Sequence, residues 1–251
     1  MNYEKPDPPR WTLMRRSGVA ICLIAHHLEW EPCTIIQVGI GQYHKEVEVM
    51  HEVWPNAKFI GFEAHPDIAI EVTKPVFDDE DRLIQEPYPG RVINKAVADY
   101  VGTSELFVKK NHKDGCSLYG VIEQQNRDEY SSLQVEVTTL QEHLKWEPCK
   151  RPILLWLDCE GGEAAVLRGS YPFIDCVDVV NVEMTAKPLG PKWCTPSEVD
   201  ALLCEDGFFQ QWVHTQRSSA GQYDAIYVQK RLFRPEYCCN VREVNRWMAI
   251  Q

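Results

Sequence analysis

Acidic side chains stand at the ends of several apolar segments of the chain. They are Glu63, Asp99, Asp158, Glu160 and Glu183. Ligands of an open α/β sheet bind beyond the carboxyl ends of its strands, so we expect these carboxylates to gather around one pocket. An extended backbone would place Asp158 and Glu160 on the same side of the chain. Helix capping by Asp158 and a salt bridge at Glu183 are the structural alternatives to a chemical role.

A glycine-containing segment, residues 34–43, is the second candidate for chemistry. An apolar run reaches Gly39 and Gly41, a helical pattern follows, and Glu63 ends the next apolar run. Glycine lets the backbone approach a ligand closely, a helix start presents free N–H groups, and the acid can accept hydrogen bonds from two ribose hydroxyls. This order of features is the outline of a nucleotide-binding βαβ unit. A plain tight turn would also need glycines, and Glu63 is the residue that favours nucleotide binding.

Apolar periodicity predicts strands and helices in alternation. Besides the strand that reaches Gly39, we expect strands at residues 58–62, 91–97, 104–108, 134–138, 152–158, 177–182, 208–214 and 224–229, and helices at 11–28, 44–54, 139–144, 161–168 and 196–206. This order implies a mostly parallel sheet with right-handed crossovers and an antiparallel pair at the C-terminal edge. We predict one α/β domain over residues 1–251, with an arm and helix at 1–30 and the core at 31–251. The acidic stretch 73–89 is expected to be a solvated loop or, alternatively, a mobile lid.

Composition and charge limit the classes of partner. The formal charge of −11 argues against a broad nucleic-acid surface, because phosphate contacts need clustered Lys and Arg. The ten cysteines lack Cys-x-x-Cys spacing, which favours free thiols in a reducing, cytoplasmic setting, and the vicinal pair Cys238 and Cys239 is the alternative candidate for metal or redox chemistry. The apolar run at 18–25 is too short to span a bilayer, so we expect a packed helix and no membrane partner.

Five short motifs follow one another between Ile35 and Glu183. They are Ile-Gln-Val-Gly ending at Gly39, Phe-Ile-Gly-Phe-Glu-Ala-His-Pro ending at Pro66, Asn-Lys-Ala-Val-Ala-Asp-Tyr-Val-Gly ending at Gly102, Val-Glu-Val-Thr-Thr-Leu ending at Leu140, and Leu-Asp-Cys-Glu-Gly-Gly-Glu-Ala-Ala-Val-Leu-Arg-Gly ending at Gly169. In this order they resemble the motifs of the FkbM family of S-adenosylmethionine-dependent methyltransferases, and the last motif is the most specific. The chain departs from the family pattern at Gln37, Tyr43 and Gln141, where an acid, a glycine and an aspartate are usual.

The resemblance implies a fold and a set of site residues. The fold would be the Rossmann-like class I methyltransferase fold, with a mostly parallel seven-stranded sheet, an antiparallel C-terminal hairpin and flanking helices. The cofactor residues would be Gln37, Gly39 and Gly41 near the methionine part, Glu63 and Ala64 at the ribose, Ala96, Val97 and Asp99 at the adenine, and Asp158 in the pocket. Asp158, Glu160 and Glu183 would line the methyl-transfer pocket as catalytic residues.

Together these features predict an S-adenosylmethionine-dependent O-methyltransferase that acts on a hydroxyl of a small-molecule or glycan acceptor. A carboxylate would take the hydroxyl proton, with Asp158 the first candidate and Glu160 or Glu183 the second. Alternatively, Asp158 and Glu183 could hold a divalent cation that acidifies the acceptor. A non-catalytic binding module of the same fold is the other functional hypothesis, and Gln37 is the residue that favours it. A nicotinamide dehydrogenase is disfavoured because the full Gly-x-Gly-x-x-Gly pattern is absent.

Overall fold

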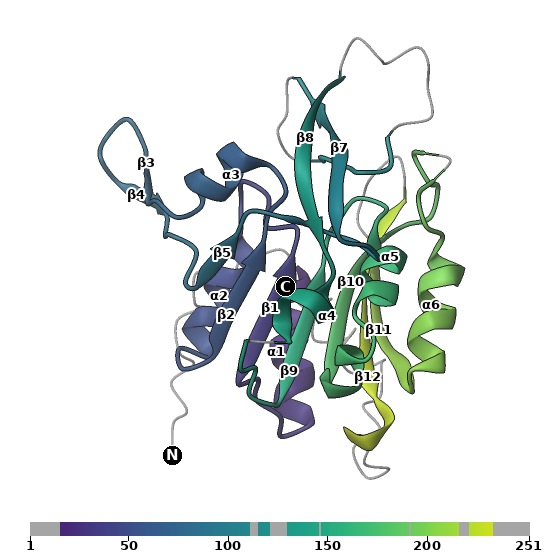
Figure 1. The fold of residues 1–251 in the computed structure, drawn as a ribbon. Helices are drawn as coiled ribbons and strands as arrows, with labels where there is room; N and C mark the ends of the chain where they lie inside the picture. The colour runs from purple at the N-terminus through teal and green to yellow at the C-terminus, as the bar shows by residue number, and fades with distance from the viewer. Residues whose placement is uncertain are drawn as a thin grey trace, which may run out of the picture.

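The computed structural model describes residues 16–110, 115–120, 130–145, 147–190, 192–215 and 221–232. The expected N-terminal arm, the start of the helix predicted at 11–28, and the pair Cys238 and Cys239 lie outside these residues. Within them, seven strands form one sheet in the order β11-β12-β10-β9-β1-β2-β5 (Figure 1). These strands are β1 (Thr34–Val38), β2 (Lys58–Phe62), β5 (Arg91–Ile93), β9 (Ile153–Leu157), β10 (Val179–Thr185), β11 (Phe208–Thr215) and β12 (Gln222–Gln229).

The strand directions confirm the predicted Rossmann-like class I architecture. Strands β5, β2, β1, β9 and β10 are parallel, and β12 runs antiparallel to both β10 and β11. From β1 the chain first builds one half of the sheet through β2 and β5, and later builds the other half through β9 and β10. The strand order therefore reverses between β1 and β9, and ligands of such sheets bind at this switch point.

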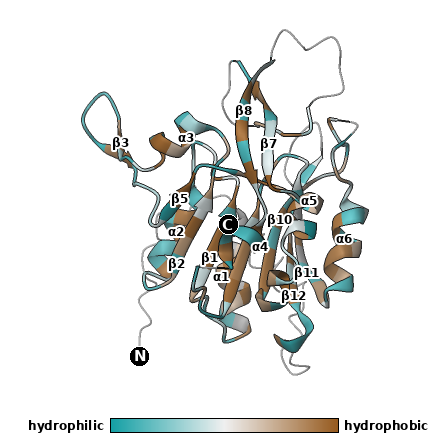
Figure 2. Cartoon of the chain, in the orientation of Figure 1, coloured by the Kyte–Doolittle hydropathy of each residue, from teal (hydrophilic) through white to brown (hydrophobic). Residues whose placement is uncertain are grey.

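Helices cover both faces of the sheet (Figure 1). One apolar cluster joins α1 (Arg16–His27) and α2 (Lys45–Val53) to one face. A second cluster joins α4 (Leu140–Leu144), α5 (Glu163–Gly169) and α6 (Pro196–Glu205) to the other face. Strand β9 is buried along its whole length and reads Ile-Leu-Leu-Trp-Leu, the continuous apolar run of a strand covered on both sides (Figure 2).

A second, three-stranded sheet stands beyond the carboxyl ends of the central strands, at the top of Figure 1. It consists of β6 (Ala96–Val97), β7 (Gly102–Lys109) and β8 (Tyr130–Thr138), in the order β6-β8-β7. The single strand predicted at 91–97 is therefore wrong, because β5 belongs to the central sheet and β6 to the second sheet. The chain turns between them at Asn94, whose side-chain amide donates hydrogen bonds to the carbonyls of Glu63 and Ala64.

The acidic stretch 73–89 is more ordered than the predicted loop. After helix α3 (Pro66–Glu71), the stretch forms a hairpin. In this hairpin, β3 (Val76–Phe77) pairs antiparallel with β4 (Leu83–Gln85). Asp78 folds the turn, because its Oδ1 accepts hydrogen bonds of 2.9 Å from the backbone N–H groups of Glu80 and Arg82. At least one acid of this stretch, Asp78, therefore has a structural role, which the acidic composition of the stretch did not indicate.

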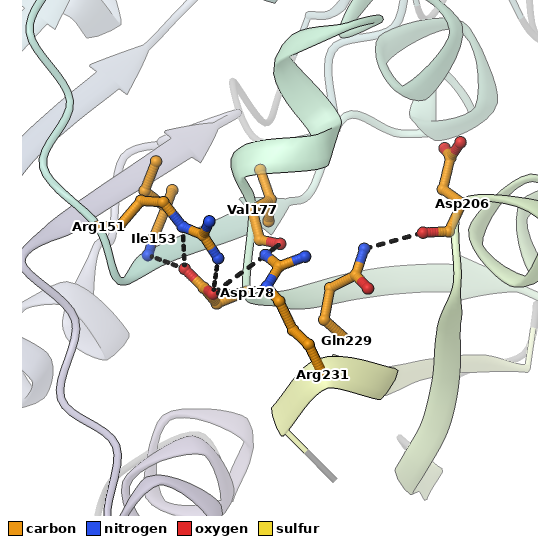
Figure 3. A network of polar contacts seen from close by, with 7 residues as sticks. All are labelled: Arg151, Ile153, Val177, Asp178, Asp206, Gln229 and Arg231. Atoms are coloured by element: carbon orange, nitrogen blue, oxygen red, sulfur yellow. Dashed lines mark hydrogen bonds and ion pairs between the residues drawn. The ribbon is translucent and has the colours of Figure 1, made fainter.

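A buried ion network ties the amino ends of the strands to the chain after β12 (Figure 3). Asp178 is 3% exposed and accepts hydrogen bonds from Arg151, at 2.6 Å, and from the backbone N–H of Ile153, at 2.7 Å. Arg231 donates to the same carboxylate at 3.0 Å and to the carbonyl of Val177. Nearby, Gln229 donates to the carbonyl of Asp206. This network therefore lies at the amino ends of the strands, whereas the switch-point ligand site lies at their carboxyl ends.

Two expectations about the chain as a whole can be compared with the structure. The eight cysteines in the described segments are free thiols, as the spacing predicted. In the part of the chain that the structure describes, no helix is long and apolar enough to cross a membrane.

Candidate functional site

A cavity of about 240 Å³ opens at the switch point, beyond the carboxyl ends of β1 and β9. Every residue predicted for the site lines this cavity except Asp99. The lining residues from the prediction are Gln37, Gly39, Gly41, Glu63, Ala64, Ala96, Val97, Asp158, Glu160 and Glu183. Segments that lie more than one hundred residues apart in the sequence thus meet in one place, because the parallel strands end at a common edge.

Asp99 lies outside the cavity lining. Its Oδ2 accepts a hydrogen bond of 3.2 Å from Nε of Arg168, an arginine on α5 that also contacts Glu198 on α6. Asp99 therefore links the turn after β6 to the outer helices. The structure provides no cavity contact for its predicted role beside the adenine.

The glycine turn after β1 is held by Glu63. This glutamate is 5% exposed, and its Oε2 accepts hydrogen bonds from the backbone N–H groups of Ile40, at 3.2 Å, and Gly41, at 3.0 Å. Its Oε1 accepts a hydrogen bond of 2.8 Å from the N–H of His65. The carboxylate that was predicted to meet the ribose therefore also fixes the turn against the end of β2.

Gly39 cannot be replaced without strain. Its φ is +82°, and a Cβ atom added there would lie 1.7 Å from the carbonyl oxygen of Asp158. The ends of β1 and β9 approach one another this closely only because residue 39 has no side chain. The contact also places Asp158 directly beside the glycine turn.

Gln37 stands where the family usually has an acid. It is 4% exposed, and its Nε2 donates a hydrogen bond of 3.2 Å to the carbonyl of Gly39. Its Oε1 is buried and has no hydrogen-bond partner. Buried acceptors are nearly always paired, so this oxygen at the cavity wall is suited to receive a donor from a ligand or from bound water.

Three carboxylates of the cavity lining form a cluster. Asp158, Glu160 and Glu183 each offer one oxygen, and these oxygens all lie within 4.8 Å of one another. Burial, together with the negative charge of Asp158, raises the pKa of Glu183 to about 10. The cluster is therefore a place where an extra proton or another positive charge is strongly favoured.

The loop from Asp158 to Gly162 is not extended, in contrast to the expectation for Asp158 and Glu160. Glu160 has a φ of +48° and Gly161 a φ of +92°, so the backbone turns through the left-handed region. Glu163 stabilises this turn, since its Oε1 accepts hydrogen bonds from the N–H groups of Cys159 and Gly161. Glu163 is buried and does not line the cavity, and burial raises its pKa. Its role is structural.

Several cavity residues were missed by the sequence analysis. Asp224 on β12 pairs directly with Glu183 on β10, and Gln222 pairs with Thr185 two residues further along the two strands. A strand register would have revealed them, because paired residues of neighbouring strands face the same side. The lining also includes Tyr119, which the sequence analysis did not single out.

Residues 115–120 form a wall of the cavity. Ser117 Oγ donates a hydrogen bond of 2.7 Å to the carbonyl of Glu160, and its backbone pairs with Phe107 of β7. Trp193 Nε1 donates a hydrogen bond of 2.9 Å to the carbonyl of Gly120. The second sheet, the carboxylate loop and the segment before α6 are thus joined through this wall.

Solved structures with a related fold include several methyltransferases. Fibrillarin of Aeropyrum pernix, solved with S-adenosyl-L-methionine, is 11% identical over 79% of this chain and 67% of its own, with a TM-score of 0.45. Magnesium protoporphyrin IX methyltransferase of Synechocystis, also with the cofactor bound, is 8% identical over 85% and 77%, with a TM-score of 0.45. Precorrin-6y C5,15-methyltransferase of Geobacter metallireducens is 9% identical over 90% and 95%, with a TM-score of 0.44. This likeness is too distant to indicate an acceptor.

No curated protein matches the chain in sequence. The profile of the family described as "Methyltransferase FkbM domain" matches residues 31–209, which contain the glycine turn, Glu63 and the carboxylate loop. Since this match spans most of the chain, the protein belongs to the FkbM family of S-adenosylmethionine-dependent methyltransferases.

Proposed function

We propose that the chain methylates a hydroxyl group of a small, polar acceptor such as a carbohydrate-like molecule. The observation that carries this proposal is the position of Asp158, which lies against Gly39 and belongs to a cluster of three carboxylates in the cavity. A carboxylate beside the donor site can accept the proton that a hydroxyl must lose when it is methylated.

The cavity has the chemistry that S-adenosylmethionine requires. The buried Oε1 of Gln37 and the glycine turn are suited to the amino-acid part, and Glu63 with Ala64 is suited to the ribose. Ala96 and Val97 offer an apolar surface for the adenine. When bound, the cofactor supplies a methyl group on a positively charged sulfur, which an acceptor oxygen can displace in line.

The contribution of the chain is positioning and proton removal. Asp158 is the first candidate for the proton acceptor, because its backbone lies against the glycine turn at Gly39 and its carboxylate belongs to the cluster. Glu160 and Glu183 are the second candidates from the same cluster. Positioning supplies the larger share of the rate gain in a displacement of this kind.

The acceptor side of the cavity is rich in hydrogen-bond acceptors. Asp224, Gln222 and Glu160 line it and can receive hydrogen bonds from several hydroxyl groups. Lys95 is the only basic side chain among the described lining residues. This balance favours a polyhydroxylated small acceptor over a phosphate-rich nucleic acid.

The test is transfer of an isotope-labelled methyl group from S-adenosylmethionine to separate pools of sugars, phenols, peptides and RNA. We expect label in ether-linked methyl groups of the sugar pool, and Asp158→Asn should reduce the rate by about 10²-fold or more. Asp99→Asn, which changes an acid outside the cavity, is the matched control and should keep the rate. Label in amine or RNA products would contradict the proposal. Bound cofactor product without transfer to any pool would favour the non-catalytic module instead.

A further inference from the structure

An apolar cluster between the second sheet and α5 forms part of the cavity lining. Ala96 of β6 and Leu106 of β7 belong to this cluster, together with Ala165 of α5. An apolar lining suits the flat base of the cofactor better than its charged or hydroxylated parts. The members of the cluster that line the cavity are Ala64, Ala96, Leu106, Cys116, Leu118 and Tyr119.

The charged side chains on either side of Ala96 and Val97 in the sequence are paired within the protein. The carboxylate of Asp99 accepts a hydrogen bond from Arg168, at 3.2 Å, and Nζ of Lys95 lies 2.8 Å from a carboxylate oxygen of Glu136. A carboxylate could accept a hydrogen bond from the amino group of adenine, but Asp99 lies outside the cavity lining. Recognition of the base therefore rests on the apolar lining.

Tyr119 contributes an aromatic ring to this lining. Its Cε2 lies 3.0 Å from the position that a Cβ atom would take at Gly162, so the ring packs against the backbone at the start of α5. Burial raises the pKa of the Tyr119 hydroxyl, and the charge of Asp99 acts in the same direction, so the side chain stays neutral. A neutral aromatic ring in an apolar wall is suited to stack on a nucleobase.

The backbone on both sides of this ring is held in place. The N–H of Tyr119 donates a hydrogen bond of 3.0 Å to Oγ of Ser117, which is 3% exposed and pairs with Phe107 of β7. On the other side, the carbonyl of Gly120 accepts a hydrogen bond of 2.9 Å from Nε1 of Trp193. The wall is therefore ordered before a ligand binds, which lowers the entropic cost of binding.

We propose that Tyr119 binds the cofactor by stacking on its adenine base. This inference rests on the cofactor placement proposed above, with the adenine at Ala96 and Val97. The base is recognised by its flat faces, and the carboxylate of Asp99 takes no part. Residues 115–120 thus bind the methyl donor, besides joining the second sheet to the carboxylate loop.

The experiment measures cofactor affinity by calorimetric titration of the full chain with S-adenosylhomocysteine. Tyr119→Ala should weaken binding by about tenfold or more, because a base loses its stacking partner. Tyr119→Phe keeps the ring and should bind within about threefold of the wild type. Tyr100→Ala is the matched control, since Tyr100 is 42% exposed and lies outside the lining, and it should bind as the wild type does.

A second ligand separates stacking from recognition by a carboxylate. In S-inosylhomocysteine a carbonyl oxygen replaces the amino group of the base, and the faces of the ring system are retained. Stacking predicts an affinity within about tenfold of that for S-adenosylhomocysteine, whereas loss of a charge-assisted hydrogen bond would cost more. A larger loss in the wild type that Asp99→Asn removes would assign the base to Asp99 and overturn the proposal.

Circular dichroism verifies that each variant is folded. Tyr119→Leu retains apolar contacts without the ring, should also bind more weakly, and replaces Tyr119→Ala if that variant does not fold. If folded Tyr119→Leu binds S-adenosylhomocysteine as the wild type does while Glu63→Gln binds it more weakly, only the stacking is refuted. Folded wild-type protein that binds no S-adenosylhomocysteine overturns both the stacking and the cofactor placement.

Discussion

At the scale of single residues, Gly39 carries the tightest steric requirement of the site. A Cβ atom there would collide with the carbonyl of Asp158, and its φ of +82° is unfavourable for any other residue. We predict that Gly39→Ala lowers the free energy of unfolding by roughly 1–3 kcal/mol or more, measured by urea denaturation.

Gly102→Ala is the matched control for this prediction. Gly102 begins β7, and the nearest atoms that its added Cβ would meet belong to the ring of Tyr100, at 3.8 Å. This variant should change the free energy of unfolding by less than about 1 kcal/mol. Equal stability of the two variants would show that the ends of β1 and β9 do not approach as closely as described.

The sequence indicated some of these residues and not others for a physical reason. Glu63 and Asp158 were recognisable because an acid after a buried apolar strand has no obvious structural purpose. Asp224 and Gln222 were not recognisable, because their neighbours across the sheet depend on strand register, which is a tertiary property. The salt bridge of Asp99 with Arg168 joins residues 69 positions apart and was equally hidden.

At the scale of elements, the start of α2 depends on a buried histidine. His44 is fully buried, its Nε2 donates a hydrogen bond of 3.0 Å to the carbonyl of Glu86, and Gln85 Nε2 donates to its Nδ1. Burial lowers the pKa of His44, although the charge of Glu48 acts in the opposite direction. The histidine therefore joins α2 to the end of β4 in its neutral form.

This arrangement predicts a specific loss of stability in acid. The unfolded chain takes up a proton on this histidine near pH 6.5 and the native state only at lower pH, so the stability that His44 contributes is complete above pH 6.5 and declines below it. Between pH 7 and 5, wild-type stability should fall more steeply than that of His44→Gln, by up to about 1.4 kcal/mol per pH unit. Thermal unfolding across pH measures this difference.

His51→Gln, a change at an exposed histidine of the same helix, should retain the wild-type slope. Parallel profiles for wild type and His44→Gln would mean that His44 is not held neutral by its surroundings.

The elements that the sequence predicted best are those with local signals. Helix α6 begins as expected, with Thr195 Oγ1 accepting a hydrogen bond from the N–H of Glu198 and Pro196 in the first turn. The hairpin β3–β4 and the division of residues 91–97 into two strands were missed. Those strands have two or three residues each, too few for a periodic pattern, and partners elsewhere in the chain fix them.

At the scale of the whole molecule, the site is a product of topology. The sheet order brings the glycine turn, Glu63 and the carboxylate loop to one edge, and the second sheet and residues 115–120 close over that edge. At the other end of the strands, Arg151 and Arg231 donate hydrogen bonds to the carboxylate of Asp178 and balance its charge. The cavity end of the sheet thus gathers the carboxylates of Asp158, Glu160 and Glu183 beside the glycine turn.

The most direct test of the account is calorimetric titration of the chain with S-adenosylhomocysteine. We predict one site per chain, weakened about tenfold or more in Glu63→Gln, because a charged acceptor of hydrogen bonds is lost. Glu52→Gln, at an exposed position of α2, should bind as wild type does. If the wild type and Glu63→Gln bind with equal affinity, Glu63 does not contact the ribose. Folded wild-type protein that shows no binding at millimolar ligand would contradict the account itself.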